Sequence, residues 1–354
     1  MKQFLKFGVS LAGIYDSSNY TTETLAIVKL IEELGFDSVW TGDSQMLHRD
    51  AYCDLTLWSI NTSRIKLGPC VTNPFTRHPS VTASAILSID ELSHGRALLG
   101  IGAGDSSVRR IGLQPRPIAQ LEEAVRTVRD LCEGRKVTFH GEYLKIRWGS
   151  PKRIPIYVAA SGPKSLETAG KVGDGVIMHA GPSEEGVEFA KDRVLKGAKS
   201  EGRSLQQEDF TFCQFLFSTI DEKDRARAIR AAKPFVTWYL VNLPEHPMIK
   251  NEVLPEDVAK KIFDYRKNYY KYDEDSSHHS SVWESSVKES EFIPDNLVEK
   301  YAIAGTPEGY ALKLKELESL GVTKVIFRSP YTDVEEFQKT LRLLAEAMKK
   351  FQAA

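Results

Sequence analysis

The fold is decided by residues 65–105, which read IKLG, PCVTNPFTRHP, SVTASAILSIDEL, SHGRALLGI and GAGD in succession. The apolar run that begins at Ile65 predicts a strand, and the cluster of Asn, Pro and Thr after it predicts a polar loop. Residues 80–92 have the apolar spacing of a helix, and residues 96–101 are a second, almost wholly apolar strand. Together these segments predict a βαβ unit whose parallel sheet is buried on both faces.

The same alternation of strands and helices continues along the chain. The strand candidates are residues 4–10, 37–41, 65–68, 96–101, 154–159, 175–179, 210–217 and 324–328, nearly all separated by helices. A (β/α)8 TIM barrel uses this number of strands in one closed sheet, and its usual length of about 250 residues leaves roughly 100 for insertions. We therefore predict an α/β fold, a TIM barrel with insertions that forms a single domain over residues 1–354. A doubly wound open sheet is the alternative.

Three local features complete the predicted fold. Thr22 or Thr21 is expected to cap the first helix, and residues 134–146 alternate like a β-hairpin whose turn is His140-Gly141-Glu142. Residues 243–294 interrupt the alternation of strands and helices with an aromatic helix at 262–272 and a polar tract at 273–281. This insertion is expected to be either a lid over the barrel mouth or an arm that contacts another subunit.

The composition is that of an ordinary soluble protein. The 354 residues carry a net charge of -1, which gives no electrostatic reason to expect nucleic acid or a membrane surface as partner. No apolar run is long enough for a transmembrane helix or a signal peptide, so a cytoplasmic location is expected. The four cysteines are far apart and lack zinc-site spacing, so we expect reduced thiols and no metal site.

Two glycine-containing loops are candidates for a cofactor site. Residues 100–105, GIGAGD, lack the spacing of a dinucleotide fingerprint. They are interpreted as a barrel loop where glycine lets a flat ring approach the backbone, with a plain turn as the alternative. Residues 161–165, SGPKS, combine a helix start, two hydroxyl groups and a lysine, which favours an anion site. A simple helix cap by Ser161 or Ser165 is the alternative.

Two further groups of polar residues follow predicted strands. Asp43 and Gln45 come after the second strand and are candidates to position a substrate or exchange a proton, although an Asp there is also typical of a helix cap. His179 ends the sixth strand and either lines the pocket or is a structural histidine. No Ser-His-Asp or paired-carboxylate pattern stands out, which suggests that an organic cofactor carries the chemistry.

Several motifs together resemble the bacterial-luciferase-like superfamily, and most of all its methylenetetrahydromethanopterin-reductase-like branch. They are VTNPFTRHP at 71–79, SIDELSHGR at 88–96, GIGAGD at 100–105, ASGPK at 160–164 with GDGV at 173–176, and GTPE at 305–308. The resemblance covers nearly the whole chain outside residues 243–294. It implies a (β/α)8 barrel that binds coenzyme F420, a deazaflavin, or alternatively FMN, at its carboxyl-terminal mouth.

The resemblance also implies roles for individual residues. Ser161, Gly162 and Ser165 match the region that holds the cofactor phosphate, and Asn73, Gly104 and Asp105 match the region facing the ring. A non-proline cis peptide is implied at Cys70–Val71, so Cys70, Val71 and Thr72 join the candidate cofactor-binding residues, together with His179. The sequence departs from many deazaflavin-dependent relatives at Asp43-Ser44, where they carry Asp-His.

We therefore expect an oxidoreductase that transfers a hydride between coenzyme F420 and an organic substrate, with Asp43 and Gln45 as catalytic candidates. An FMN-dependent monooxygenase acting with molecular oxygen is the close alternative, and a non-enzymatic flavin-binding protein is a remoter one. The expected partners are a small-molecule substrate and copies of the same chain, in a homodimer or a higher homo-oligomer.

Overall fold

Eight parallel strands form a barrel in the computed structural model, which describes residues 5–11, 19–114, 117–205, 210–242, 254–268, 287–330 and 333–353. The strands are β1 (Lys6–Ser10), β2 (Ser38–Thr41), β3 (Lys66–Pro69), β4 (Leu99–Ile101), β7 (Ile156–Ala160), β8 (Gly175–Met178), β9 (Thr211–Ile220) and β11 (Lys324–Arg328). They pair in the order β3-β2-β1-β11-β9-β8-β7-β4. All eight predicted strands are present, and the predicted TIM barrel is confirmed.

The barrel closes between β3 and β4. Near the amino-terminal end of these two strands, the Leu67 N–H donates to the Arg96 carbonyl at 3.1 Å and the Leu98 N–H donates to the Leu67 carbonyl at 2.9 Å. Toward the carboxyl-terminal end, the Thr72 N–H donates to the Gly100 carbonyl at 3.0 Å, and the Thr72 carbonyl accepts the Gly102 N–H at 2.9 Å. These bonds join strands that would be unpaired edges in an open doubly wound sheet, so that alternative is wrong.

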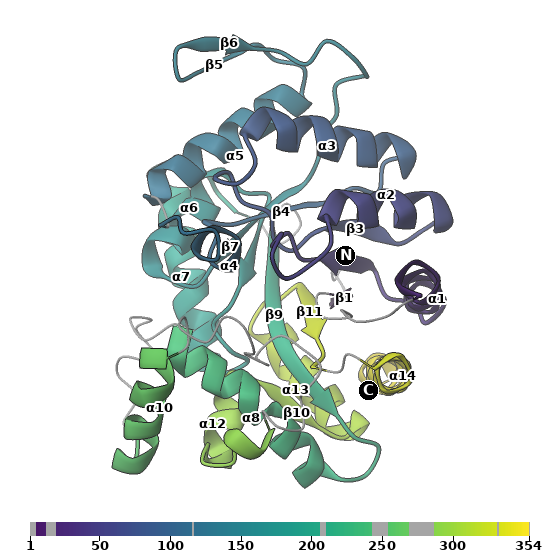
Figure 1. The fold of residues 1–354 in the computed structure, drawn as a ribbon, viewed down its shortest axis with the longest axis vertical. Coiled ribbons are helices and arrows are strands. Elements are labelled where there is room, and N and C mark those ends of the chain that lie inside the picture. The colour runs from purple at the N-terminus through teal and green to yellow at the C-terminus, as the bar shows by residue number, and fades with distance from the viewer. Residues whose placement is uncertain are drawn as a thin grey trace.

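Helices surround the sheet, as Figure 1 shows. They are α1 (Tyr20–Glu33), α2 (Ala51–Asn61), α3 (Pro79–Leu92), α4 (Ser106–Arg109), α5 (Ile118–Cys132), α6 (Pro163–Val172), α7 (Glu184–Ser200), α8 (Arg225–Asn242), α10 (Glu256–Asn268), α12 (Asp295–Tyr301), α13 (Pro307–Ser319) and α14 (Val334–Ala353). The predicted cap of the first helix is wrong, because α1 begins earlier than expected. Its cap residue is Asn19, whose carbonyl accepts the Glu23 N–H at 3.1 Å.

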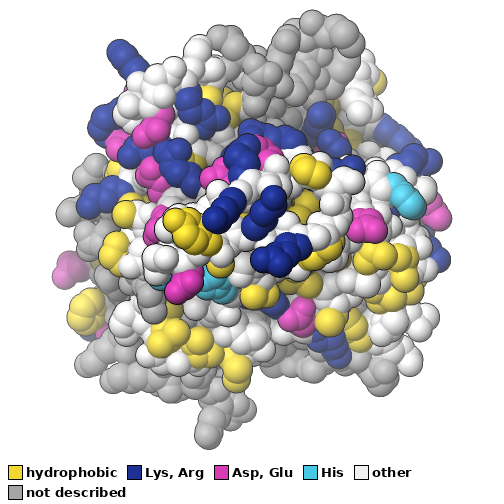
Figure 2. Space-filling model, turned by 90° about the horizontal axis from the view of Figure 1, so that it is seen from above, with side chains coloured by type: hydrophobic (Ala, Val, Ile, Leu, Met, Phe, Trp, Pro, Cys, Tyr) yellow, Lys and Arg dark blue, Asp and Glu magenta, His cyan; other side chains and the backbone are white. Residues whose placement is uncertain are grey.

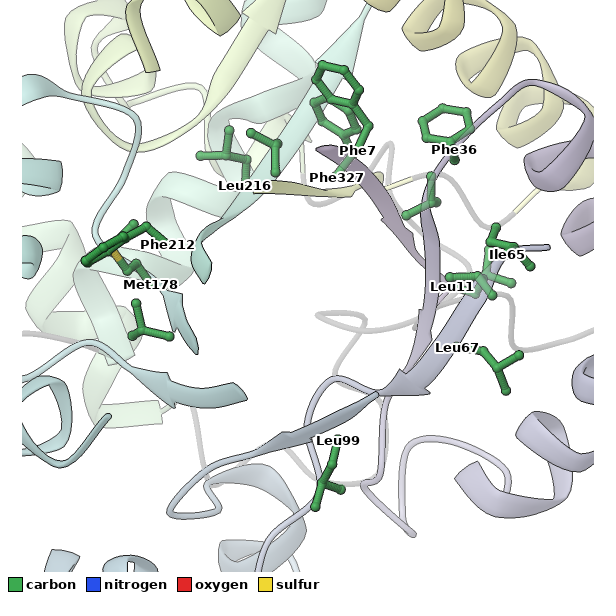
Figure 3. Close-up of a cluster of buried hydrophobic side chains, with 14 of the residues drawn as sticks. Phe7, Leu11, Phe36, Ile65, Leu67, Leu99, Met178, Phe212, Leu216 and Phe327 are labelled. Carbon is green, nitrogen blue, oxygen red and sulfur yellow. The ribbon is translucent and has the colours of Figure 1, made fainter. Parts of the chain in front are cut away.

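Two layers of apolar side chains hold the strands in place. Figure 3 shows Phe7, Leu67, Leu99, Phe212 and Phe327 pointing outward from the ring of strands, where they are buried against the helices. Successive side chains of a strand alternate between its two faces, so the neighbouring residues point into the barrel. A second cluster fills that interior with Trp40, Leu98, Tyr157, Ile177, Cys213 and Ile326.

Two smaller strand pairings lie outside the barrel. The predicted hairpin is present as β5 (Val137–Phe139) and β6 (Glu142–Leu144), but its turn is one residue shorter than predicted. His140 and Gly141 both have positive φ, at 49° and 86°, and Glu142 already pairs with Phe139. A further strand, β10 (Ile303–Gly305), pairs with the last three residues of β9. It was not predicted, because three residues are too few to show periodicity.

The insertion at 243–294 is described only in part. Val258 and Ile262 of α10 are buried in one cluster with Val236 and Leu240 of α8. The polar tract at 273–281 lies outside the described residues, so the choice between a lid and a subunit arm stays a prediction. Within the described part of the chain, no helix has the length and apolar character needed to cross a membrane.

Candidate functional site

The candidate residues follow the carboxyl ends of β2, β3, β4, β7 and β8. In a barrel of parallel strands these ends meet at one face, where the loops that leave the strands build the active site. Hydrogen bonds of their side chains connect the loops that follow β2, β3 and β4.

The predicted cis peptide between Cys70 and Val71 is present at the end of β3. Two glycines of β4 and its loop make room for this bend. A side-chain carbon at Gly100 would lie 2.3 Å from the Pro69 carbonyl oxygen, and one at Gly102 would lie 3.1 Å from a Val71 methyl group. The space beside these two glycines is therefore filled by the β3 segment of the protein itself.

Arg77 joins the β2 and β3 loops through two carboxylates. Its guanidinium donates to both oxygens of Asp43, at 3.0 and 3.3 Å, and to Asp50 at 2.5 Å. The Thr72 hydroxyl donates to the same Asp43 carboxylate at 2.7 Å. Asp43 is 6% exposed, and both of its oxygens are engaged by these bonds. The arrangement holds Thr72, the residue directly after the cis peptide, in a fixed position.

The positive charge of Arg77 and the negative charges of Asp43 and Asp50 stabilise one another. Burial alone would lower the pKa of Arg77, but hydrogen bonds and charge interactions with Asp43 and Asp50 raise it. Burial would raise the pKa of Asp50, but the Arg77 guanidinium and the Tyr52 and Cys53 N–H groups together lower it. Asp50 also accepts the Tyr52 and Cys53 N–H groups as the cap of α2. The helix-cap interpretation therefore applies to Asp50 and not to Asp43.

Ser106 and Ser107, which were not predicted as site residues, connect the β4 loop to the β2 and β3 loops. The Ser44 and Ser106 hydroxyls lie 2.7 Å apart, and the Gln45 amide donates to the Ser107 carbonyl at 2.9 Å. The Asn73 amide donates to the Ser107 hydroxyl at 3.0 Å. Ser44 is thus part of a hydrogen bond between the β2 and β4 loops.

The amide side chain of Asn73 forms hydrogen bonds with other residues of the protein. Besides its bond to Ser107, its amide nitrogen donates to the Thr76 hydroxyl, and its oxygen accepts the Phe75 and Thr76 N–H groups. Gly104 has φ +75°, and a side-chain carbon there would lie 2.6 Å from Val108 and 3.2 Å from Asn73. Asp105 is exposed and pairs with Arg109 at 2.8 Å. Asn73 and Gly104 therefore lie against each other, while Asp105 faces outward.

The loop after β7 leads directly into α6. Gly162 is the cap residue of this helix and no side chain caps its first turn, so the interpretation of Ser161 or Ser165 as a helix cap is wrong. The Ser165 hydroxyl instead donates to the Gly162 carbonyl at 2.9 Å. A side-chain carbon at Gly162 would have only the Ser165 hydroxyl within 4 Å, at 3.9 Å. The first turn of α6 is therefore open, and its N–H groups suit an anion such as a phosphate.

His179 lies in an aromatic group at the end of β8. The centre of its ring is 5.3 Å from Phe215, 5.4 Å from Phe217, 5.3 Å from Trp238 and 4.5 Å from Tyr239. The ring is half-buried, so His179 has the surroundings of a packed aromatic residue.

The structure thus brings Asp43, Gln45, Thr72 and Asn73 into one network and places Ser161, Gly162 and Ser165 on a separate loop. Arg77, Ser106 and Ser107 are the network members that the sequence did not reveal as such. Arg77 stands in the TRHP part of the recognised motif, which was the available signal. Among the described residues, no group of His, Cys, Asp and Glu has the arrangement of a metal site.

Comparison with known proteins defines the class to which this barrel and its mouth belong. A family model described as "Luciferase-like monooxygenase" matches residues 4–324. The chain belongs to this family of oxidoreductases.

Within the family, the chain is related to methylenetetrahydromethanopterin reductases. It is 34% identical to the 5,10-methylenetetrahydromethanopterin reductase of Archaeoglobus fulgidus over 332 residues, which is 92% of this chain and 94% of the relative. It is 32% identical to the enzyme of Methanolobus tindarius, over 90% and 93% of the two chains. The solved structure of the coenzyme F420 dependent tetrahydromethanopterin reductase from Methanopyrus kandleri matches with a TM-score of 0.75 and 27% identity, covering 98% and 99%.

Proposed function

We propose that this protein transfers a hydride between coenzyme F420 and an organic substrate at the mouth of the barrel. The observation that carries the proposal is the likeness to F420-dependent reductases along nearly the whole chain, from the first strand to the last helix. The substrate is proposed only as a reducible organic molecule, because the identity of 34% supports the class of reaction more strongly than a particular compound.

The residues at the mouth fit a cofactor with a ring and a phosphate. The open first turn of α6, with Ser161, Gly162 and Ser165, would hold the phosphate, because the N–H groups of a helix start attract anions. The segment from Cys70 to Thr72 would support one face of the ring. When bound, the deazaflavin supplies the hydride chemistry, and the protein contributes orientation and exclusion of water.

The contacts of Asp43 and Gln45 support positioning roles. The Asp43 carboxylate is held by Arg77 and Thr72, and the Gln45 amide is held by the Ser107 carbonyl. We infer that these two side chains fix the shape of the β3 and β4 loops around the ring rather than exchange protons with a substrate.

Titration of the purified protein with F420 and with FMN, followed by the fluorescence of each ring, tests the proposal. We expect F420 to bind more tightly and the reduced form to be oxidised anaerobically by an organic acceptor. Tighter binding of FMN with oxygen consumption would favour the monooxygenase. A bound cofactor that never turns over would favour a flavin-binding protein, and binding of neither cofactor would refute all three.

A further inference from the structure

The last residue of β11 places a cation on the inner side of the barrel mouth. Lys324 and Ile326 of this strand face the interior, since the Lys324 ammonium lies 5.5 Å from the Trp40 ring centre and Ile326 packs in the same cluster. Phe327 points outward, as Figure 3 shows. The alternation of side chains along a strand therefore puts Arg328 on the interior side. It is half-buried, and its guanidinium donates to the Ser329 carbonyl at 2.8 Å.

Ser10 lies beside Arg328 on the neighbouring strand. The two residues are partners in the register of β1 and β11. Phe7 points outward, so Gly8 and Ser10 face the interior, and a side-chain carbon at Gly8 would lie 2.9 Å from the indole nitrogen of Trp40. Ser10 is fully buried, and among the described residues its hydroxyl has no hydrogen-bond partner. A buried hydroxyl without a partner is costly, which indicates that a ligand atom supplies the missing bond.

Arg328 also interacts with the segment from Cys70 to Thr72, which would support the ring. Burial raises the pKa of the Cys70 thiol to about 12, and the charge of Arg328 opposes this rise, so the guanidinium lies within electrostatic range of Cys70. Cys70 forms one side of the cis peptide. The charge of Arg328 therefore acts on the β3 segment at which the proposed ring would rest.

We propose that Ser10 and Arg328 together recognise a negatively charged oxygen of the bound cofactor ring. This inference rests on the proposed function, since it names residues of the same site. A fixed cation beside a flavin-like ring favours the ring form that carries negative charge, and a neighbouring hydroxyl directs that oxygen by a hydrogen bond.

The other titratable groups that face the barrel interior do not replace this cation. Among the residues that the structure describes, they are Cys70, Tyr157, Cys213, Lys324 and Asp37. Burial raises the pKa of both thiols and of the tyrosine, so these three stay neutral near pH 7. Lys324 is paired with Asp37 at 2.5 Å. None of these five groups supplies a positive charge at the mouth end of the interior, and Arg328 does.

The test measures the ionisation of oxidised F420 bound to the protein, from its visible absorption as the pH is varied, together with its dissociation constant. Relative to the wild type, Arg328→Gln should raise the midpoint of ring ionisation by about one pH unit, and it should weaken binding of the ionised ring about tenfold. Arg328→Lys should restore most of the shift, and Ser10→Ala should give a smaller change in the same direction.

Controls separate this inference from a change in folding and from the proposed function. Arg342→Gln makes the same charge change on the exposed side of α14, and it should leave both quantities as in the wild type. Thermal unfolding of each variant reports its folded state, and Arg328→Lys keeps the charge if Arg328→Gln is unstable. If the wild type binds F420 and the midpoint of ring ionisation equals that of Arg328→Gln, the inference is overturned and the proposed function is not. A wild type that does not bind F420 removes the proposed function and the inference with it.

Discussion

The Thr72 hydroxyl donates a hydrogen bond to the Asp43 carboxylate across 2.7 Å, between loops that follow neighbouring strands of the barrel. The Arg77 guanidinium donates to the same carboxylate oxygen at 3.0 Å. Asp43 therefore connects the position of the β3 loop to that of the β2 loop. The consequence is that a change at Asp43 should act on the shape of the ring site before it acts on proton transfer.

Replacing Asp43 by Asn keeps the size of the side chain and removes its charge. We expect the free energy of unfolding to fall by about 1.5–3 kcal/mol, the usual value for a hydrogen bond to a charged group. F420 binding should weaken about tenfold, while kcat changes only a few-fold. Urea unfolding, fluorescence titration and steady-state kinetics measure the three quantities. Asp192→Asn, on the exposed side of α7, is the matched control.

Loss of a catalytic proton transfer would give another pattern for Asp43→Asn. In that case kcat would fall by about 10²–10⁴, and cofactor affinity would stay close to that of the wild type. Such a result would contradict the positioning role.

The seam between β3 and β4 should not tolerate a side chain at Gly100. Gly100→Ala would place a carbon 2.3 Å from the Pro69 carbonyl oxygen, so the backbone of one strand must move. We expect a loss of about 1–3 kcal/mol in the free energy of unfolding, as for other overpacked sites. Gly305→Ala is the matched control, because a side-chain carbon there meets nothing within 4 Å. Equal stability of the two variants in urea unfolding would refute the close packing of this seam.

The buried pair of Lys324 and Asp37 should set the pH range of stability. The Lys324 side chain is 2% exposed and lies 2.5 Å from the Asp37 carboxylate. Burial opposes both charges, but each partner stabilises the other, so the pKa of Asp37 is lowered and that of Lys324 is raised. The Asp37 contribution is present above its ordinary pKa of 3.8 and is lost as pH falls through the lowered value. The Lys324 contribution is present below 10.5 and is lost as pH rises through the raised value.

Lys324→Met should therefore cost about 3–5 kcal/mol at pH 7, because it leaves a buried carboxylate without its partner. The difference from the wild type should shrink on acidification, as Asp37 of the variant becomes protonated. Adding Asp37→Asn to Lys324→Met should recover much of the loss, since both charges are then removed. Urea unfolding between pH 4 and pH 9 measures these changes. A variant as stable as the wild type at pH 7 would show that the pair contributes nothing.

The open first turn of α6 should select for the cofactor phosphate. Ser161→Asp adds a negative charge before this turn, so F420 should bind at least about tenfold more weakly, which is about 1.4 kcal/mol. A ring fragment without the phosphate should bind as it does to the wild type. Ser200→Asp, at the exposed end of α7, controls for the added charge. Equal weakening for the fragment and the whole cofactor would place the phosphate elsewhere.

The sequence by itself determined the barrel and the positions of its loops. Each strand is a short apolar run and each helix has apolar residues at helical spacing, so the local spacing of apolar residues distinguishes strands from helices. The turn residues after β3 and the glycines before Asp105 likewise mark where polar loops begin. Ser161, Gly162 and Ser165 could be placed at a helix start in the same way, and the cis peptide at Cys70–Val71 followed from the resemblance.

Only the tertiary structure decided which polar side chains meet. Arg77 reaches Asp43 over 34 residues of sequence, and Asn73 reaches Ser107 over the same separation. Ser10 and Arg328 come from the first and last strands of the barrel, which become neighbours only when the whole chain folds into the sheet. Local periodicity specifies which face of an element is buried but not the direction of a polar side chain in a loop. That direction is fixed by contacts between loops whose strands the barrel places side by side.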